Sequence, residues 1–253
     1  MDDNQALTSN NNSPEIASDR QKPNLDDFTS TVVHDLQAPL RSLTMFTELL
    51  AQEYQNELDE KGQLYLDRIS HNGLRMQTLI EDLLTFSRAG VGEQTWMTVD
   101  LNQTLELVQS DLQSEIARSG AKITVSELPQ IFINPQDIHQ LFQNLIENAL
   151  KFCDRPPEIV VSITAQGEEW LFTVEDNGVG IAPEFQLEIF DVFKRLHPAD
   201  VYPGSGMGLA ICQKIIKRYD GIIWVESEVA QGSTFNFTIP MNVCPQAPMA
   251  KVV

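Results

Sequence analysis

Apolar residues in the first third of the chain recur at spacings of three and four, which is the period of an amphipathic helix. Two stretches between Leu25 and Arg88 carry this pattern. Its positions are Val33, Leu36, Leu40, Leu43, Thr47 and Leu50 in the first stretch, and Leu66, Ile69, Gly73, Met76, Ile80 and Leu83 in the second. The pattern predicts an antiparallel hairpin of two long helices with a turn near residues 56–61.

Two helices cannot enclose a hydrophobic core alone, because each buries only one stripe of its surface. Pairing the hairpin at residues 23–89 with a second copy covers both stripes and gives a dimeric four-helix bundle. The alternative is an intramolecular hairpin that packs against the rest of the chain. We expect the homodimer.

Residues 98–241 alternate between helical and strand-like patterns, after a glycine-containing linker within residues 90–97. Helices are expected at Leu101–Arg118, Pro135–Phe152 and Met207–Tyr219, and strands at Lys122–Ser126, Ile131–Ile133, Glu158–Ala165, Trp170–Glu175, Ile222–Ser227 and Ser233–Ile239. Residues 181–203 look loop-like, with a short helix inside. This mixture predicts a two-layer α/β sandwich, so the chain is a multidomain α plus α/β protein.

Composition narrows the setting in which the protein works. Residues 1–22 are polar and predicted to be disordered, and residues 242–253 are expected to be a flexible tail. A net charge of −19 argues against nucleic acid as a partner. No apolar run approaches the ~18 residues of a membrane helix, so we expect no membrane insertion. Three cysteines without metal-site spacing, and no secretion signal, indicate a cytoplasmic protein.

The helix expected at Pro135–Phe152 ends in amide, cationic and aromatic side chains. Asn144, Asn148 and Lys151 or Phe152 recur every three or four residues, so they share one face. An asparagine oxygen is a suitable ligand for Mg²⁺, which adds waters and nucleotide phosphates to a few protein oxygens. Asn148 is the natural ligand, Lys151 can neutralise phosphate and Phe152 can pack against a purine. The alternative is a surface helix end with scattered amides.

Two glycine-containing segments follow, reading DNGVG at Asp176–Gly180 and GSGMG at Gly204–Gly208. Asp176 ends an expected strand, where its carboxylate can accept a hydrogen bond from an exocyclic amine such as that of adenine. Gly178 and Gly180 let the backbone approach the base. The second segment leads into an apolar helix, whose first N–H groups favour phosphate. Each segment alone is common in proteins, but together and in this order they predict a nucleotide site.

His34 differs from the other histidines because Asp35 follows it and Pro39 lies five residues further on. Neutral imidazole is a competent nucleophile near neutral pH. An adjacent carboxylate can orient the ring and take its proton as a phosphoryl group arrives. These neighbours make His34 a candidate phosphoryl acceptor, and the alternative, which an isolated histidine favours, is a solvent-facing histidine on a helix.

In combination, these segments resemble the transmitter core of bacterial sensor histidine kinases of the phytochrome-like type. HDLQAPLR at 34–41 resembles the phospho-acceptor box, NLIENALKF at 144–152 the asparagine box, and FDVFKR at 190–195 the phenylalanine box. DNGVG and GSGMG resemble the two glycine boxes. The resemblance covers residues 24–240 and implies a dimerising hairpin followed by an ATP-binding sandwich of the gyrase and histidine-kinase superfamily.

The resemblance also implies an activity, namely ATP-dependent autophosphorylation of His34, aided by Asp35, and transfer to an Asp of a response regulator receiver domain. The implied cofactors are ATP and Mg²⁺, with Asn148 as the metal ligand and a lid at residues 182–206. The implied ATP-binding residues are Asn144, Asn148, Lys151, Phe152, Asp176, Gly178, Gly180, Arg195, Gly204, Ser205, Gly206, Met207 and Gly208.

Three positions depart from the family pattern. Members that dephosphorylate their regulator usually carry Thr or Asn four residues after the histidine, where this chain has Ala38, so we expect weak phosphatase activity. Ser205 stands where Thr is usual. Asp220–Gly221 replaces a common Gly–Gly turn and still supports a left-handed residue.

Two other functions remain as alternatives. An ATP-hydrolysing machine of the gyrase or mismatch-repair type uses Glu one turn before the metal-binding Asn. Here that position is Asn144, and Glu147 is expected on a different face. A degenerate transmitter that only dimerises and docks a regulator is disfavoured by the intact Asn148 and Asp176. The input is open, because no sensor domain is recognisable, so a separate sensor protein or a longer chain supplies it. The cognate regulator, and phosphorylation within or between chains, are also open.

Overall fold

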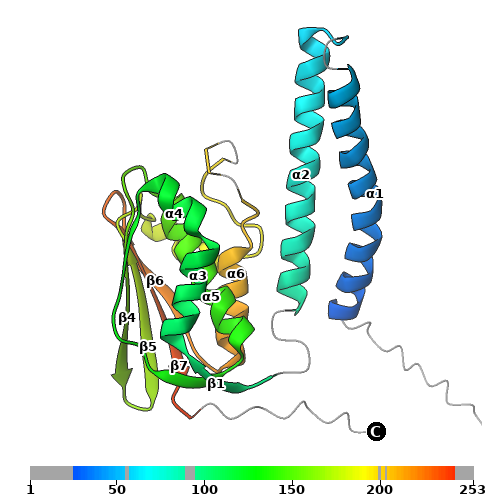
Figure 1. The fold of residues 1–253 in the computed structure, drawn as a ribbon. Coiled ribbons are helices and arrows are strands. Elements are labelled where there is room, and N and C mark those ends of the chain that lie inside the picture. Colours follow the sequence, from blue (N-terminus) through cyan, green and yellow to red (C-terminus); the bar gives the residue numbers. More distant parts are fainter. Residues whose placement is uncertain (1–24, 55–56, 89–94, 199–200, 203, 243–253) are drawn as a thin grey trace, which may run out of the picture.

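The computed structural model of the protein describes residues 25–54, 57–88, 95–198, 201–202 and 204–242, with side chains from residue 35 onwards. The segment at 1–22 that was expected to be disordered, most of the expected linker and the expected tail beyond residue 242 lie outside these residues. Figure 1 shows two parts, a long helical hairpin and an α/β domain beside it.

The hairpin consists of α1 (Leu25–Tyr54) and α2 (Glu60–Arg88), as the apolar spacing predicted. The Asp59 carboxylate accepts a hydrogen bond from the Gly62 N–H at 2.8 Å. This bond satisfies a donor that has no partner within the first turn of α2. The polar residue at the turn therefore helps to set where the second helix begins.

Only part of the predicted apolar stripe is covered within the hairpin. Leu40, Thr47, Gly73 and Ile80 are buried, and an added Cβ at Gly73 would come within 3.1 Å of Thr44 Oγ1. Five other positions remain exposed over 46–51% of their surface, namely Leu36, Leu43, Leu50, Ile69 and Met76. Leu66 and Leu83 are half-buried, and the side chain of Val33 lies outside the described part of the structure. This exposed apolar row on both helices is typical of a surface that binds another protein.

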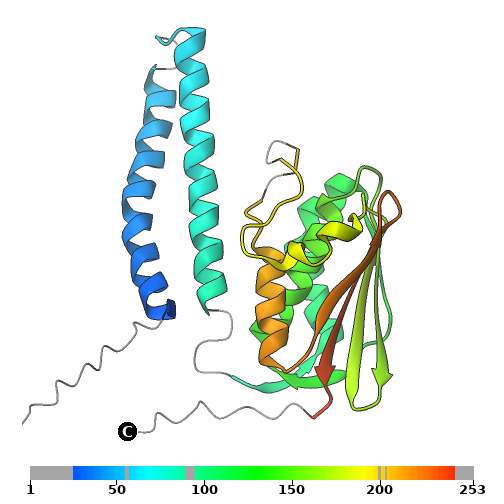
Figure 2. The same cartoon turned by 180° about the vertical axis from the view of Figure 1, so that it is seen from behind.

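The second part contains a five-stranded sheet. Figures 1 and 2 show its helices on one face of the sheet. Its elements are β1 (Met97–Asp100), α3 (Leu101–Asp111), α4 (Gln113–Ser119), β2 (Lys122–Val125), β3 (Gln130–Ile133), α5 (Pro135–Lys151), β4 (Glu158–Gln166), β5 (Glu169–Asp176), the 3-10 helices η1 (Pro183–Phe185) and η2 (Glu188–Phe190), α6 (Gly208–Arg218), β6 (Ile223–Glu228) and β7 (Gly232–Pro240). The sheet order is β2-β4-β5-β7-β6, and only β2 and β4 pair in parallel. The predicted two-layer α/β sandwich is confirmed.

Aromatic side chains hold α5 against the sheet. Phe142 of α5 contacts Phe172 and Phe237 at ring-centroid distances of 6.2 and 6.1 Å, and these two rings stack on each other at 4.7 Å. All three side chains are fully buried. Burial of large rings dominates the energetics of a core, so this contact fixes the rotation of α5. The opposite, polar face of α5 is thereby turned away from the sheet.

Three predictions about this domain need correction. The helix expected at Leu101–Arg118 is two helices, because Leu112 leaves helical geometry (φ −95°, ψ 13°) and buries its side chain in the core. Met97, expected at the end of the linker, begins β1, which pairs with β3. This pairing joins residues distant in sequence, which local patterns cannot reveal. The short helix expected within residues 181–203 is the two 3-10 helices.

The C-terminal end of α2 contacts α6, and α2 lies between α1 and the sandwich (Figures 1 and 2). Lys214 Nζ donates hydrogen bonds to the carbonyl oxygens of Phe86 at 2.6 Å and Ser87 at 3.2 Å. It also lies 4.7 Å from the centroid of the Phe86 ring. The last carbonyls of a helix lack intrahelical partners and attract cations, so Lys214 fixes which face of the sandwich meets α2. No helix among the described residues is both long and apolar enough to span a bilayer.

Candidate functional site

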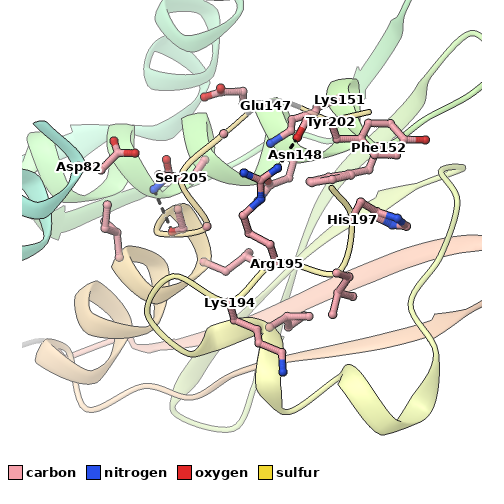
Figure 3. Close-up of a pocket in the computed structure, with 18 of the residues that line it drawn as sticks. Asp82, Glu147, Asn148, Lys151, Phe152, Lys194, Arg195, His197, Tyr202 and Ser205 are labelled. Carbon is pink, nitrogen blue, oxygen red and sulfur yellow. Dashed lines mark hydrogen bonds between the residues drawn. The ribbon is translucent and has the colours of Figure 1, made fainter. Parts of the chain in front are cut away.

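A cavity of ≈ 450 Å³ opens between α5, the end of β5 and the segment that leads into α6 (Figure 3). It brings together most of the nucleotide residues predicted from the sequence, namely Asn144, Asn148, Lys151, Phe152, Asp176, Gly180, Arg195, Gly204, Ser205, Gly206 and Gly208. Its volume is in the range of small-molecule sites. Residues that are distant in the chain therefore converge on one ligand-sized space.

Two of the predicted residues do not line this cavity. Met207 is fully buried in the hydrophobic core, so its side chain does not face a ligand. Gly178 lies behind the wall, where an added Cβ would collide with the carbonyl oxygen of Phe152. Both residues support the backbone of the cavity wall without facing the cavity.

Asp176 is held in one orientation at the end of β5. Its Oδ1 accepts hydrogen bonds from the N–H groups of Gly178 at 2.8 Å and Ser233 at 3.1 Å. Among the described residues, no hydrogen bond is made to Oδ2. Burial raises the pKa of Asp176, and the two backbone hydrogen bonds oppose that rise. The carboxylate is therefore fixed and can accept one more donor from the cavity.

The two amides of α5 play different parts. Asn144 donates a hydrogen bond to the carbonyl of Gly208 at 3.2 Å and accepts one from Gln140 at 3.1 Å. It thus ties α5 to the start of α6. The side chain of Asn148 makes no hydrogen bond within the described part of the chain and lines the cavity. Its amide oxygen is available to a ligand.

Lys151 and Arg195 bring two positive charges to the same wall (Figure 3). Burial lowers the pKa of Lys151, the nearby Arg195 lowers it further, and Glu147 opposes the change. Gly204 has a φ of +144°, and an added Cβ would come within 2.5 Å of Lys151 Nζ. Glycine is therefore required where the loop passes over this ammonium. Two neighbouring cations with limited hydration favour an anionic ligand.

The position of Glu147 differs from the prediction. It was expected on a different face from Asn144, but it lines the same cavity next to Lys151 and opposite Asp82 of α2 (Figure 3). Burial raises the pKa of Glu147, and Asp82 raises it further while Lys151 opposes the rise. Glu147 follows Asn144 by three residues and precedes Lys151 by four, so helical spacing itself places it on their face of α5, and the prediction was wrong.

The hairpin residues that line the cavity all come from α2, namely Thr78, Glu81, Asp82 and Thr85. Asp35 is exposed on α1. The backbone of His34 lies in α1, and its side chain is outside the described part of the structure. The predicted acceptor therefore lies on α1, whereas α2 borders the cavity and separates α1 from the sandwich (Figure 1).

His197 and Tyr202 are among the cavity residues that sequence reasoning missed. Their rings lie near that of Phe152, at 6.0 and 5.1 Å between centroids. Both residues belong to the loop-like stretch at 181–203, which has no periodic pattern to orient its side chains. The available signal was an aromatic and an imidazole ring placed shortly before a glycine loop.

The fold and this cavity define a nucleotide-binding domain attached to a helical hairpin, and two family models match these parts separately. Residues 133–243 match the family described as histidine kinase-, DNA gyrase B-, and HSP90-like ATPase. Residues 24–92 match the His Kinase A (phospho-acceptor) domain. The chain belongs to the sensor histidine kinases and carries their transmitter core, as the sequence motifs predicted.

Two cyanobacterial phytochrome proteins match most of this chain. The chain is 40% identical to cyanobacterial phytochrome A of Nostoc sp. over 231 residues, which are 90% of this chain and 30% of that protein. It is 39% identical to phytochrome-like protein Cph1 of Synechocystis sp. over 225 residues, 88% of this chain and 30% of that protein. The chain therefore spans about a third of the length of these relatives.

Solved structures agree with the fold. Full-length ShkA in complex with AMPPNP aligns with a TM-score of 0.66 at 25% identity, covering 87% of this chain and 47% of that one. Histidine kinase AdeS of Acinetobacter baumannii aligns with a TM-score of 0.59 at 21% identity, covering 83% and 98%. ThkA in complex with the response regulator TrrA aligns with a TM-score of 0.59 at 22% identity, covering 86% and 62%.

Replacing Asp176 by Asn is expected to weaken binding of adenine nucleotides about ten- to hundredfold, because the new amide presents a donor to the amine of the base. The Oδ1 contacts to Gly178 and Ser233 can persist, so the melting temperature should change little. Glu175→Gln is the matched control, since Glu175 precedes Asp176 on β5 but is exposed. Calorimetric dissociation constants that are equal for the two variants would count against adenine recognition by Asp176.

Proposed function

We propose that the protein uses ATP to phosphorylate His34 and then passes the phosphoryl group to an aspartate of a response regulator receiver domain. The observation that carries this proposal is the cavity in which Asp176, Asn148, Lys151 and Arg195 meet. It offers an acceptor for the base amine at one wall and cations for phosphates at another. The phospho-acceptor family match over residues 24–92 supports His34 as the recipient.

In the first step, the bond between the terminal phosphorus of ATP and its bridging oxygen breaks, and a phosphorus–nitrogen bond forms on the imidazole. ADP leaves, and Asp35, the next residue in the chain, takes the proton of the imidazole. In the second step the phosphorus–nitrogen bond breaks as a phosphorus–oxygen bond forms on the regulator's carboxylate, and the imidazole of His34 is released. Lys151 and Arg195 serve the first step by neutralising phosphate charge and orienting the phosphates of ATP.

Mg²⁺ is the metal that the donor set fits. The described residues contain no cluster of three or more His, Cys, Asp or Glu side chains able to hold a metal. A site built on the Asn148 amide oxygen would therefore depend on the nucleotide phosphates for further ligands, which is the usual habit of Mg²⁺. Once bound, Mg²⁺ would neutralise charge on the transferred phosphoryl group.

The cavity faces α2, whereas His34 lies on α1. Transfer therefore requires either that the sandwich moves relative to its own hairpin or that the cavity reaches the histidine of another copy. The exposed apolar row on α1 and α2 supports a homodimer in which such a copy is present. Light scattering after gel filtration tests the dimer, which predicts a mass of twice 28.4 kDa.

A response regulator is the partner class proposed for the second step. One fold neighbour, ThkA, was solved with the response regulator TrrA. The relatives named above are longer than this chain, so the sensory input is assigned to segments or proteins outside it. We also propose a cytoplasmic location for this chain.

The test of the proposed function is incubation of the chain with γ-labelled ATP and Mg²⁺, followed by addition of candidate receiver domains. We expect a phosphoprotein whose label is lost in acid and kept in alkali, and then moves to a receiver. Calorimetry should show uptake of adenine nucleotide that depends on Mg²⁺. Label that is stable in acid, or nucleotide uptake without any labelling, would contradict the assignment.

Ala38 leads to a separate prediction about phosphatase activity toward the phosphorylated regulator. It cannot position a water molecule, so the protein should remove phosphate from a purified phospho-regulator only slowly. Ala38→Thr, which adds a hydroxyl at this exposed position of α1, should speed that loss. Release of phosphate is followed with time at constant regulator concentration. Rapid dephosphorylation by the unchanged protein would overturn the prediction.

A further inference from the structure

Three rings meet at one end of the cavity. Phe152 follows the last turn of α5, while His197 and Tyr202 come from the segment before the glycine loop. Centroid distances are 6.0 Å from Phe152 to His197, 5.1 Å from Phe152 to Tyr202 and 5.1 Å from His197 to Tyr202. Figure 3 shows them next to Lys151 and Arg195. These distances are those of aromatic pairs in direct contact.

Tyr202 is held from two sides. Its carbonyl oxygen accepts a hydrogen bond from Arg195 Nη2 at 2.8 Å, and its hydroxyl donates to Asp154 Oδ1 at 2.7 Å. The bond to Asp154 raises the pKa of Tyr202, so the hydroxyl keeps its proton and stays a donor near neutral pH. Asp154 lies just beyond Phe152 in the chain. The bond therefore fastens the segment before the glycine loop to the end of α5.

The surroundings of the rings define the chemistry of a matching ligand. Lys151 Nζ lies 4.5 Å from the centroid of Phe152, and Arg195 contacts Tyr202. A flat ring system is needed to replace contacts between aromatic side chains, and negative charge is needed beside the two cations. A nucleotide carries both, with its base at one end and its phosphates at the other.

We propose that His197 and Tyr202 are positioning residues that complete, with Phe152, an aromatic wall around the base and ribose of the bound nucleotide, and that the hydrogen bond from Tyr202 to Asp154 fastens this wall. The inference rests on the proposed function, since it takes ATP as the ligand of the cavity. It adds three residues to the site, two of which carry the wall and one of which anchors it.

The same contacts suit one other role, in which the rings fill the place of the base and must leave before ATP binds. The two roles predict opposite changes in ATP affinity when a ring is removed. Removing a wall residue weakens binding of ATP, whereas removing a plug strengthens it. A polyphosphate without a base serves as the comparison ligand. In either role its affinity should not depend on the rings, whereas general damage to the cavity would weaken it as well.

The test compares ATP with inorganic tripolyphosphate, each with Mg²⁺, by calorimetric competition on the full chain. Tyr202→Phe and Asp154→Ala should each weaken ATP binding about three- to tenfold, the effect of losing one hydrogen bond. Combining them should add nothing further, because both remove the same bond. Tyr202→Ala and His197→Ala should weaken it about tenfold or more through lost ring contact. Tripolyphosphate affinity should stay near that of the unchanged chain.

Tyr65→Phe is the matched control, since Tyr65 is an exposed tyrosine of α2 outside the cavity. If the unchanged chain does not bind ATP, the proposed function fails. If it binds ATP and the Tyr202 and Asp154 variants bind equally well or more tightly, the aromatic wall is refuted and the proposed function stands. Equal losses for ATP and tripolyphosphate refute the wall too, because they indicate damage to the phosphate end.

Discussion

Replacing His34 by Gln removes labelling from γ-labelled ATP and leaves nucleotide binding intact. Glutamine keeps a polar side chain and suits a helix, but it offers no nitrogen that can form the phosphorus–nitrogen bond. We expect labelling to fall by about a thousandfold or more, to background. The ATP dissociation constant should be unchanged, because the cavity is lined by α2 and the sandwich.

His71→Gln is the matched control for this experiment. It makes the same substitution at an exposed histidine of α2, which belongs to the same hairpin. We expect it to label like the unchanged chain. Full labelling of His34→Gln would show that the acceptor is elsewhere. Loss of labelling in both variants would point to damage to the hairpin instead.

Asn148→Asp abolishes labelling by acting at the nucleotide and metal site rather than at the acceptor histidine. The change replaces a neutral amide by a carboxylate next to the expected phosphates, where it repels their charge and alters the metal site. A loss of labelling of about a hundredfold or more is expected, with weaker ATP binding in Mg²⁺. The fold should persist, because the Asn148 side chain makes no hydrogen bond with the described residues.

Gln213→Glu controls for the added charge, since it changes an amide to a carboxylate on α6 outside the cavity. Gln213 accepts a hydrogen bond from Lys217 at 3.1 Å, so a carboxylate there keeps a favourable partner. This variant should label normally. An Asn148→Asp protein that labels at the normal rate would remove Asn148 from the metal site.

The elements with strong periodic patterns were predictable from the sequence. The hairpin and α5 carry long amphipathic repeats, and their spacing alone gave their positions. The break at Leu112 was not predictable, because helical hydrogen bonds continue on both sides of it and only packing in the core moves the backbone. Strand β1 was missed for a related reason, since it is short and depends on pairing with β3.

The candidate site divides in the same way. Asp176, Asn148 and the glycine loop carried residue types whose chemistry indicated a nucleotide, and the structure brings them to one cavity. Side chains on irregular backbone could not be oriented from sequence, so His197 and Tyr202 were overlooked. Glu147 was misplaced although its offsets of three residues from Asn144 and four from Lys151 put it on their face of α5. The contribution of α2 to the cavity wall is a property of domain arrangement, and no local pattern encodes it.

The central claim is that the cavity delivers the terminal phosphoryl group of ATP to one imidazole on the hairpin. The measurement that tests it most directly is mass-spectrometric mapping of phosphate on the chain after reaction with ATP and Mg²⁺, under alkaline conditions. We predict a single modified side chain, His34, with one ADP formed for each phosphate retained. Phosphate on another residue, or conversion of ATP to free phosphate with an unmodified chain, would contradict the account.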